Sequence, residues 1–145
     1  MNYSRYYFET QVFANREESF MFPDTLCEMM LKAQDEAYGD GLDREFRHPY
    51  MWLCKSHYYS SGTSFYNFPY AFGGLFARGL YTKYVNEGAS FISKYKELLK
   101  ATTVNSVEDT AKIAGIDLTD KEFWRMSLRS YEERVDEFER LALNK

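Results

Sequence analysis

The amino-acid sequence predicts an all-α fold, a compact multi-helix domain that takes in residues 1–145. Three observations predict it: apolar residues recur at spacings of three and four, capping residues stand before several of these segments, and no run of alternating β-branched residues indicates a strand. The composition, with 45% hydrophobic and 28% charged residues over 145 positions, allows a buried core. Because we find neither a linker nor an internal repeat, we expect a single domain.

The N-terminal part of the chain is expected to form two helices. The first covers about residues 3–18. The second opens at Pro23, where Thr25 and Glu28 have the spacing of a capping box, in which each side chain satisfies a free backbone N–H. This helix stops at Gly39, which belongs to a Gly-Asp-Gly stretch.

The middle of the chain is expected to hold a short helix after Pro49, a turn over residues 60–64 and a long helix over about residues 66–87. Pro69 lies in the first turn of the long helix, where a missing N–H is tolerated. Apolar residues appear on nearly every side of this helix, so we expect it to be central. Small residues would let a neighbouring helix approach closely: Gly73, Gly74, Ala77 and Gly79.

The C-terminal part is expected to form three further helices. One begins near Phe91, and Ser106 is suited to cap a second that ends at Gly115. Thr119 and Glu122 are spaced like a second capping box, which precedes the last helix. That helix carries an apolar stripe at alternating spacings of four and three, which we expect to pack into the core. The stripe consists of Trp124, Leu128, Tyr131, Val135, Phe138 and Ala142.

Charge and composition exclude several classes of partner. The net charge is −4 and the acidic residues are spread along the chain, so we expect no nucleic-acid partner. Residues 56–77 contain no charged side chain, but polar residues such as His57 and Asn67 make this stretch unsuited to a membrane. The N-terminus lacks a signal-peptide pattern, and Cys27 and Cys54 follow no redox or metal spacing. We therefore expect reduced thiols in a cytoplasmic protein.

The sequence contains no complete catalytic set. There is no H-E-x-x-H motif, which would bind zinc through two histidines one helical turn apart, and we assign neither a metal site nor a cofactor to this chain. His48 and His57 are the only histidines. Cys54 stands three residues before His57 and would suit a thiol nucleophile beside its base, but the aromatic residues nearby favour a buried structural cysteine.

A group of polar and aromatic side chains remains as a candidate site. It gathers within an uncharged stretch and consists of His57, Tyr58, Tyr59, Tyr66, Asn67 and Tyr70. Tyrosine hydroxyls and imidazole N–H groups can donate hydrogen bonds to a carbonyl oxygen as it becomes an oxyanion, most strongly where water is kept away. Core tyrosines with satisfied hydroxyls are the alternative interpretation, and the residues alone leave both open.

Several stretches carry a pattern that is more specific than helix periodicity. They are Tyr6–Glu9, Val12–Phe13, Ala33–Asp40, Tyr50–Trp52, Lys55–Tyr59, Phe65–Gly73, Gly115–Asp117 and Phe123–Trp124. In these stretches the chain resembles oligoendopeptidase F, of the thimet-oligopeptidase-like family of zinc metallopeptidases. The block over residues 50–73 is the most specific, because its rare residues occur in order and at the family's spacing.

The resemblance implies a mostly helical, cytoplasmic hydrolase that cleaves short peptides inside a deep cleft. Zinc in that family is held by the histidines of H-E-x-x-H and a later glutamate, all upstream of the region matched here. The chain is therefore expected to be a C-terminal portion without the zinc-binding segment. The resemblance assigns substrate binding to His57 and oxyanion stabilisation to Tyr66, which makes both candidate catalytic residues, and it adds Tyr70 and Tyr59 as substrate contacts. Ser56 departs from the proline that is common before this histidine.

Three functional hypotheses follow. In the first, the chain is the substrate-binding and oxyanion-stabilising part of a zinc metalloendopeptidase and is inactive alone. In the second, it is a non-catalytic helical module that binds peptides or a protein. In the third, it is a subunit that completes a separately encoded zinc-bearing partner. The apolar surface that a missing N-terminal catalytic portion would cover also leads us to expect a homo-oligomer.

Overall fold

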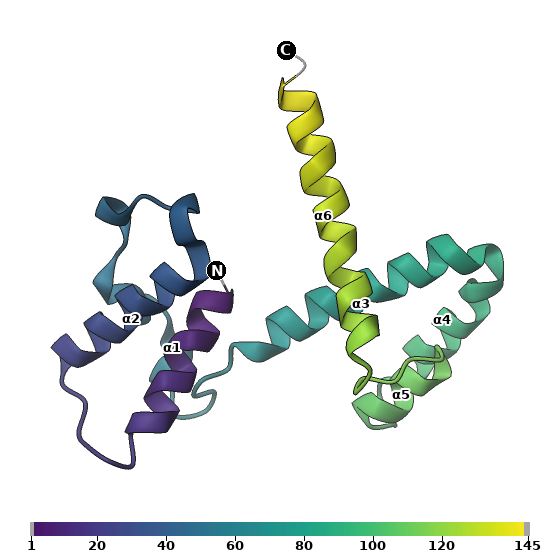
Figure 1. Ribbon diagram of the computed structural model, residues 1–145. Coiled ribbons are helices and arrows are strands. Elements are labelled where there is room, and N and C mark those ends of the chain that lie inside the picture. The colour runs from purple at the N-terminus through teal and green to yellow at the C-terminus, as the bar shows by residue number, and fades with distance from the viewer. Residues whose placement is uncertain (1, 144–145) are drawn as a thin grey trace. The chain divides into compact units, whose positions relative to one another are not determined.

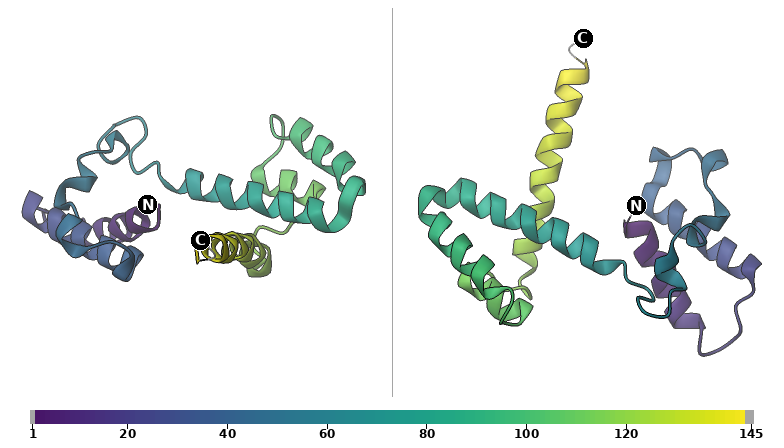
Figure 2. Two further views of the ribbon diagram at one scale, coloured as in Figure 1. Left: turned by 90° about the horizontal axis from the view of Figure 1, so that it is seen from above. Right: turned by 180° about the vertical axis from the view of Figure 1, so that it is seen from behind.

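A computed structural model describes residues 2–143 of the chain and is helical throughout (Figure 1, Figure 2). The described residues contain no strand, which confirms the predicted all-α class. The α-helices are α1 (Asn2–Asn15), α2 (Pro23–Tyr38), α3 (Phe68–Glu87), α4 (Phe91–Ala101), α5 (Val107–Ile113) and α6 (Lys121–Leu143). Short 3₁₀ turns lie at Gly39–Gly41 (η1), Arg44–Phe46 (η2), Pro49–Trp52 (η3), Ser56–Tyr58 (η4) and Gly88–Ser90 (η5). No described helix is long and apolar enough to cross a membrane.

The chain divides into two compact units, Met1–Ala71 and Phe72–Lys145. Each unit has its own cluster of buried apolar side chains. That residues 1–145 form a single domain remains a prediction.

The first unit is built on the packing of α1 against α2 (Figure 1). Its buried cluster consists of Phe8, Val12, Met30 and Ala33. Phe8 and Val12 stand four residues apart on α1, and Met30 and Ala33 stand three apart on α2, so each helix presents one apolar face to the other.

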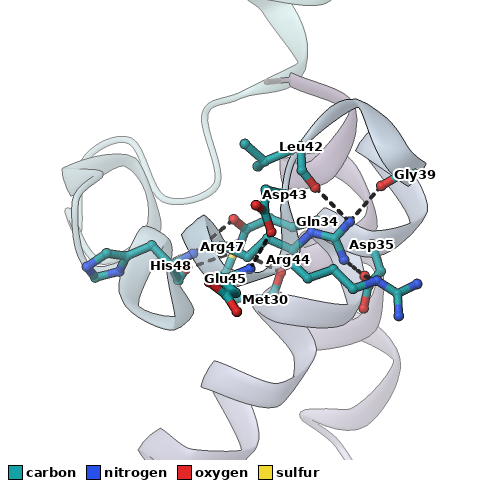
Figure 3. Close-up of polar contacts among 10 residues, drawn as sticks. All are labelled: Met30, Gln34, Asp35, Gly39, Leu42, Asp43, Arg44, Glu45, Arg47 and His48. Carbon is teal, nitrogen blue, oxygen red and sulfur yellow. Dashed lines mark hydrogen bonds and ion pairs between the residues drawn. The ribbon is translucent and has the colours of Figure 1, made fainter.

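Hydrogen bonds and an ion pair hold the segment around Arg47 and His48 against the C-terminal end of α2 (Figure 3). The Arg47 side chain, 3% exposed, pairs with Asp35 and donates a hydrogen bond of 2.6 Å to the carbonyl of Gly39. The buried Gln34 amide donates to the His48 carbonyl at 3.0 Å and accepts from the His48 N–H at 3.3 Å. These bonds satisfy backbone groups that a loop would otherwise leave unpaired, and they fix where η3 begins.

The core of the second unit gathers side chains from α3, α4, α5 and α6 and from the residues after α5. Its buried members are Leu80, Phe91, Leu98, Ala111, Ala114, Ile116 and Phe123. The α3 helix meets α6 at Gly79, where an added Cβ would come within 2.7 Å of Ser127 Oγ and even nearer to the Phe123 ring. Gly79 therefore has the role predicted for the small residues of this helix, whereas Gly73 and Gly74 face open space.

Two expectations about α3 and α6 are wrong for the described residues. Within α3 only Gly79 and Leu80 are buried, so the helix is not covered on every side. In the apolar stripe of α6 only Trp124 packs against the core, and the stripe is exposed from Leu128 onward. The sequence identified apolar surface on both helices, but it does not tell which protein surface covers it.

The helix caps differ in part from the predicted ones. Ser106 Oγ accepts from the N–H of Asp109 at 3.1 Å, as predicted. The Thr25 capping box is wrong, because α2 already begins at Pro23 and Thr25 lies inside the helix. The Thr119 box is also wrong: Thr119 donates its hydroxyl to Asp117, and Asp120 accepts the N–H of Glu122 at 2.9 Å instead. The residue at the start of the helix is therefore not the predicted threonine: it is Pro23 in α2, and Asp120 accepts the backbone N–H at the start of α6.

Candidate functional site

The candidate site is built on a loop that leaves the core and returns to it. Tyr58 packs against Phe8 with ring centroids 5.2 Å apart, and Phe65 packs against Phe13 at 4.7 Å. Between them the chain makes a loop that the Phe65 N–H closes by donating to the His57 carbonyl at 2.5 Å. Two aromatic anchors thus hold the two ends of the loop on the first unit.

Phe65 adopts a backbone conformation that is uncommon for its residue type. Its φ is +56°, the one positive φ of a non-glycine residue among those described. A large side chain in this region carries a backbone strain of roughly 1–3 kcal/mol, which the surrounding packing must offset. Tilted ring contacts of Phe65 with Phe13 and Tyr58 provide that packing. Such strain concentrates at functional sites, although it does not by itself identify one.

The beginning of α3 then positions two tyrosines. Asn67 is only 2% exposed and fixes the chain where the helix starts. Its carbonyl accepts from the Tyr70 N–H at 3.3 Å, while the Tyr66 N–H donates to Thr63 at 3.2 Å. Tyr66 precedes the buried asparagine by one residue and Tyr70 follows it by three, so their side chains are held on a short rigid segment.

His57, Tyr66 and Tyr70 form one aromatic cluster. The ring centroids lie 6.2 Å apart for His57 and Tyr66, 5.7 Å for His57 and Tyr70, and 6.0 Å for the two tyrosines. The tyrosines are 47% and 53% exposed, and His57 is half-buried, so a ligand can reach all three. The structure therefore brings three of the four sequence-predicted site residues together.

Tyr59 does not join this cluster in the described structure. Its hydroxyl donates to the Leu53 carbonyl at 3.0 Å, and none of its ring contacts within the described chain is with the other three residues. The other histidine has a structural position, because His48 Nδ1 accepts the Tyr50 N–H at 3.1 Å at the start of η3.

A buried polar group beside the loop was not singled out by the sequence patterns. Glu9 lies on the buried face of α1, and burial raises the pKa of its carboxyl to about 7, although the charge of Arg5 lowers it. Burial, with the negative charge of Glu9 as a further cause, raises the pKa of Tyr58 above its usual range. The signal was present: Arg5 and Glu9 share the helical face of Phe8 and Val12, where charged residues are uncommon.

The described residues do not fit a zinc site. Among residues 2–143, no three histidine, cysteine, aspartate or glutamate side chains come together in a group able to hold a metal ion. Cys27 and Cys54 are both free thiols. The chemistry available at the cluster is hydrogen-bond donation from one imidazole and two phenols.

Comparison with curated proteins relates the chain distantly to the peptidases. It is similar to Oligopeptidase PepF of Bacillus subtilis (strain 168), with 27% identity over 121 residues. These residues make up 83% of this chain but 18% of that protein, so the chain spans less than a fifth of the length of the relative it matches. Neither a protein-family model nor a solved structure matches the chain significantly.

Proposed function

We propose that this chain is the substrate-binding and oxyanion-stabilising part of a zinc metalloendopeptidase that cleaves short peptides, and that it does not turn over substrate alone. The observation that carries the proposal is the cluster of His57, Tyr66 and Tyr70 on an anchored loop. The distant similarity to an oligopeptidase supports the same class of substrate.

The three rings have complementary chemical roles in this proposal. The His57 imidazole donates to a carbonyl of the bound peptide and orients its backbone. The Tyr66 hydroxyl donates to the oxygen of the scissile carbonyl, and the bond strengthens as that oxygen gains negative charge. Tyr70 packs against both rings and supplies a second contact to the peptide. Zinc would activate the attacking water in the complete enzyme, and its ligands belong to protein outside the described residues.

The proposal is tested by peptide binding and peptide cleavage measured on the same purified chain. A fluorescein-labelled short peptide should bind saturably in an anisotropy titration, and His57→Gln and Tyr66→Phe should each weaken binding by about fivefold or more, since each removes a direct hydrogen bond. Tyr59→Phe is the matched control: it also removes one phenol hydroxyl, but one that already bonds Leu53, so peptide affinity should be unchanged.

Cleavage of a quenched fluorescent peptide, with added zinc and with or without a chelator, decides the second half of the proposal. No turnover is expected. Chelator-sensitive turnover would contradict the proposed inactivity of the isolated chain. Absence of peptide binding, or equal loss of affinity in Tyr59→Phe, would contradict the proposed binding site.

A further inference from the structure

The C-terminal half of α6 stands apart from the packed part of the second unit. The contacts of α3 with α6 extend to Ser130 and Tyr131. The Ser130 hydroxyl accepts from Arg78 Nε at 2.6 Å, its carbonyl accepts from Arg78 Nη2 at 2.9 Å, and the Arg78 guanidinium lies over the Tyr131 ring at 5.4 Å. Every residue from Tyr131 to Leu143 is exposed. Figures 1 and 2 both show this part of the helix projecting beyond α4 and α5.

An unpacked helical segment of this length is only marginally stable in water. Beyond Ser130, α6 continues over thirteen described residues, 131–143, and isolated helices shorter than roughly 12–15 residues are marginal even with strong helix formers. Helices gain most of their stability by packing an apolar face. The exposed half of α6 therefore needs a surface to pack on.

The exposed side chains have the spacing of a coiled-coil seam. Leu128, Tyr131, Val135, Phe138 and Ala142 alternate in steps of three and four, which are the a and d positions of a heptad that starts at Leu128. Four of the five are large exposed apolar residues. An apolar stripe at a and d positions is typical of a helix that pairs with another helix. The stripe follows this pattern up to Phe138, and Leu141, at a g position, widens it in the last turn.

The charges that flank the seam select the partner and its direction. In this register Arg134 occupies a g position and Glu139 the e position five residues later. In a parallel pair of identical helices, g of one helix faces e of the next heptad on its partner, so Arg134 meets Glu139 twice, once on each side. In an antiparallel pair, e faces e, and Glu132 would meet Glu139, which brings like charges together.

From this juxtaposition we propose that the exposed seam of α6, over residues 128–142, is the interface of a parallel coiled-coil dimer of this chain. Each a and d residue then packs against its own copy, and the two Arg134–Glu139 pairs fix the orientation. The occupant of the seam is a second copy of the chain, because the flanking charges are self-complementary in this arrangement.

The proposal is tested on the full chain by sedimentation velocity from about 5 to about 300 µM, a range that spans the affinity expected for a seam of two heptads. A concentration-dependent dimer is expected, and its helix content should rise with dimerisation because α6 gains a packing surface. Val135→Lys places a charge in the seam and should leave the chain monomeric. Glu133→Lys introduces the same residue at an f position, and the dimer should persist.

Charge exchange distinguishes the parallel dimer from other assemblies. Glu139→Arg should weaken the parallel dimer by about tenfold, since both inter-helix pairs become repulsive. Combining it with Arg134→Glu should restore the affinity. Tighter association of Glu139→Arg would indicate an antiparallel pair and overturn the proposal. A chain that stays monomeric at the highest concentration, or a dimer unaffected by Val135→Lys, would overturn it as well.

Discussion

At the scale of single residues, the first unit carries a carboxyl group in an unfavourable environment. Glu9 is buried on α1 beside Arg5 and near Tyr58, and burial raises the pKa of Glu9 to about 7 from its usual value of 4.5. Because the native state binds the proton more tightly than the unfolded chain, the free energy of unfolding should fall as the pH rises from about 4.5 to about 7. Above pH 7 the loss is complete.

Glu9→Gln removes this titration while keeping the size of the side chain. Relative to the original chain, the variant should be more stable at pH 8 by roughly 1–2 kcal/mol, and this advantage should disappear by pH 4.5. Urea unfolding followed by Trp52 fluorescence, with Trp124→Phe in both proteins, reports on the first unit. Glu28→Gln changes an exposed carboxyl of α2 and serves as the control. An equal gain at both pH values would contradict the assigned role of burial.

Gly79 shows why a single small residue matters where α3 meets α6. An added Cβ would contact the Phe123 ring and lie 2.7 Å from Ser127 Oγ, and such overpacking costs about 1–3 kcal/mol. Gly74 lies in the same helix with nothing near its missing side chain, so only helix propensity counts there.

Gly79→Ala should therefore destabilise the second unit by up to about 2 kcal/mol after the propensity gain is subtracted. Gly74→Ala should stabilise it by about 0.5–1 kcal/mol. Thermal and urea unfolding followed by Trp124 fluorescence measure both. Changes of the same sign in the two variants would contradict the close approach of α6 at Gly79.

At the scale of elements, periodicity predicted the helices better than it predicted their surroundings. The long helix expected over residues 66–87 is α3, Phe68–Glu87, and the helix expected to stop at Gly39 ends at Tyr38. Periodicity is a property of neighbouring residues along the chain, so it locates helices. The capping boxes at Thr25 and Thr119 were wrong because the spacing of two residues does not fix where a helix begins. The α2 helix begins at Pro23 without a side-chain cap, and before α6 the polar residue that accepts a backbone N–H is Asp120.

The candidate site was predictable in part for a similar reason. His57, Tyr66 and Tyr70 were named from the sequence and lie together, because short-range chain geometry relates them. Tyr59 was also predicted as a site residue, but its hydroxyl donates a hydrogen bond to the Leu53 carbonyl in the turn after η3. Glu9 lies far from the loop in sequence, and only the packing of α1 on Tyr58 brings it near.

At the scale of the whole molecule, the exposed apolar side chains are numerous for 145 residues. Among the largest are Phe20, Phe46, Phe68 and Phe138, which are 69–80% exposed. Surfaces of this kind usually contact other protein. Under the function proposed above, the protein that covers this surface would supply the remainder of a catalytic cleft.

Complementation tests this idea directly. The chain should be mixed with a zinc-bearing oligopeptidase polypeptide that lacks the corresponding segment, and cleavage of a quenched fluorescent peptide should then appear. In the reconstituted complex, Tyr66→Phe should lower kcat by about a hundredfold, the usual effect of removing one oxyanion donor. Tyr59→Phe should leave kcat unchanged. Unaltered turnover by Tyr66→Phe would remove Tyr66 from the mechanism and leave a purely binding role for the cluster.

The loop between the two aromatic anchors has a consequence for how peptide selectivity could change. Tyr58 and Phe65 hold its ends, and residues 61–64 between them are exposed and belong to neither core cluster. The Thr63 carbonyl that accepts the Tyr66 N–H is a backbone group, so side-chain exchanges in this tip should keep both anchors and the three clustered rings in place. The side chains of the tip can therefore change, by evolution or by design, independently of the fold that carries the site.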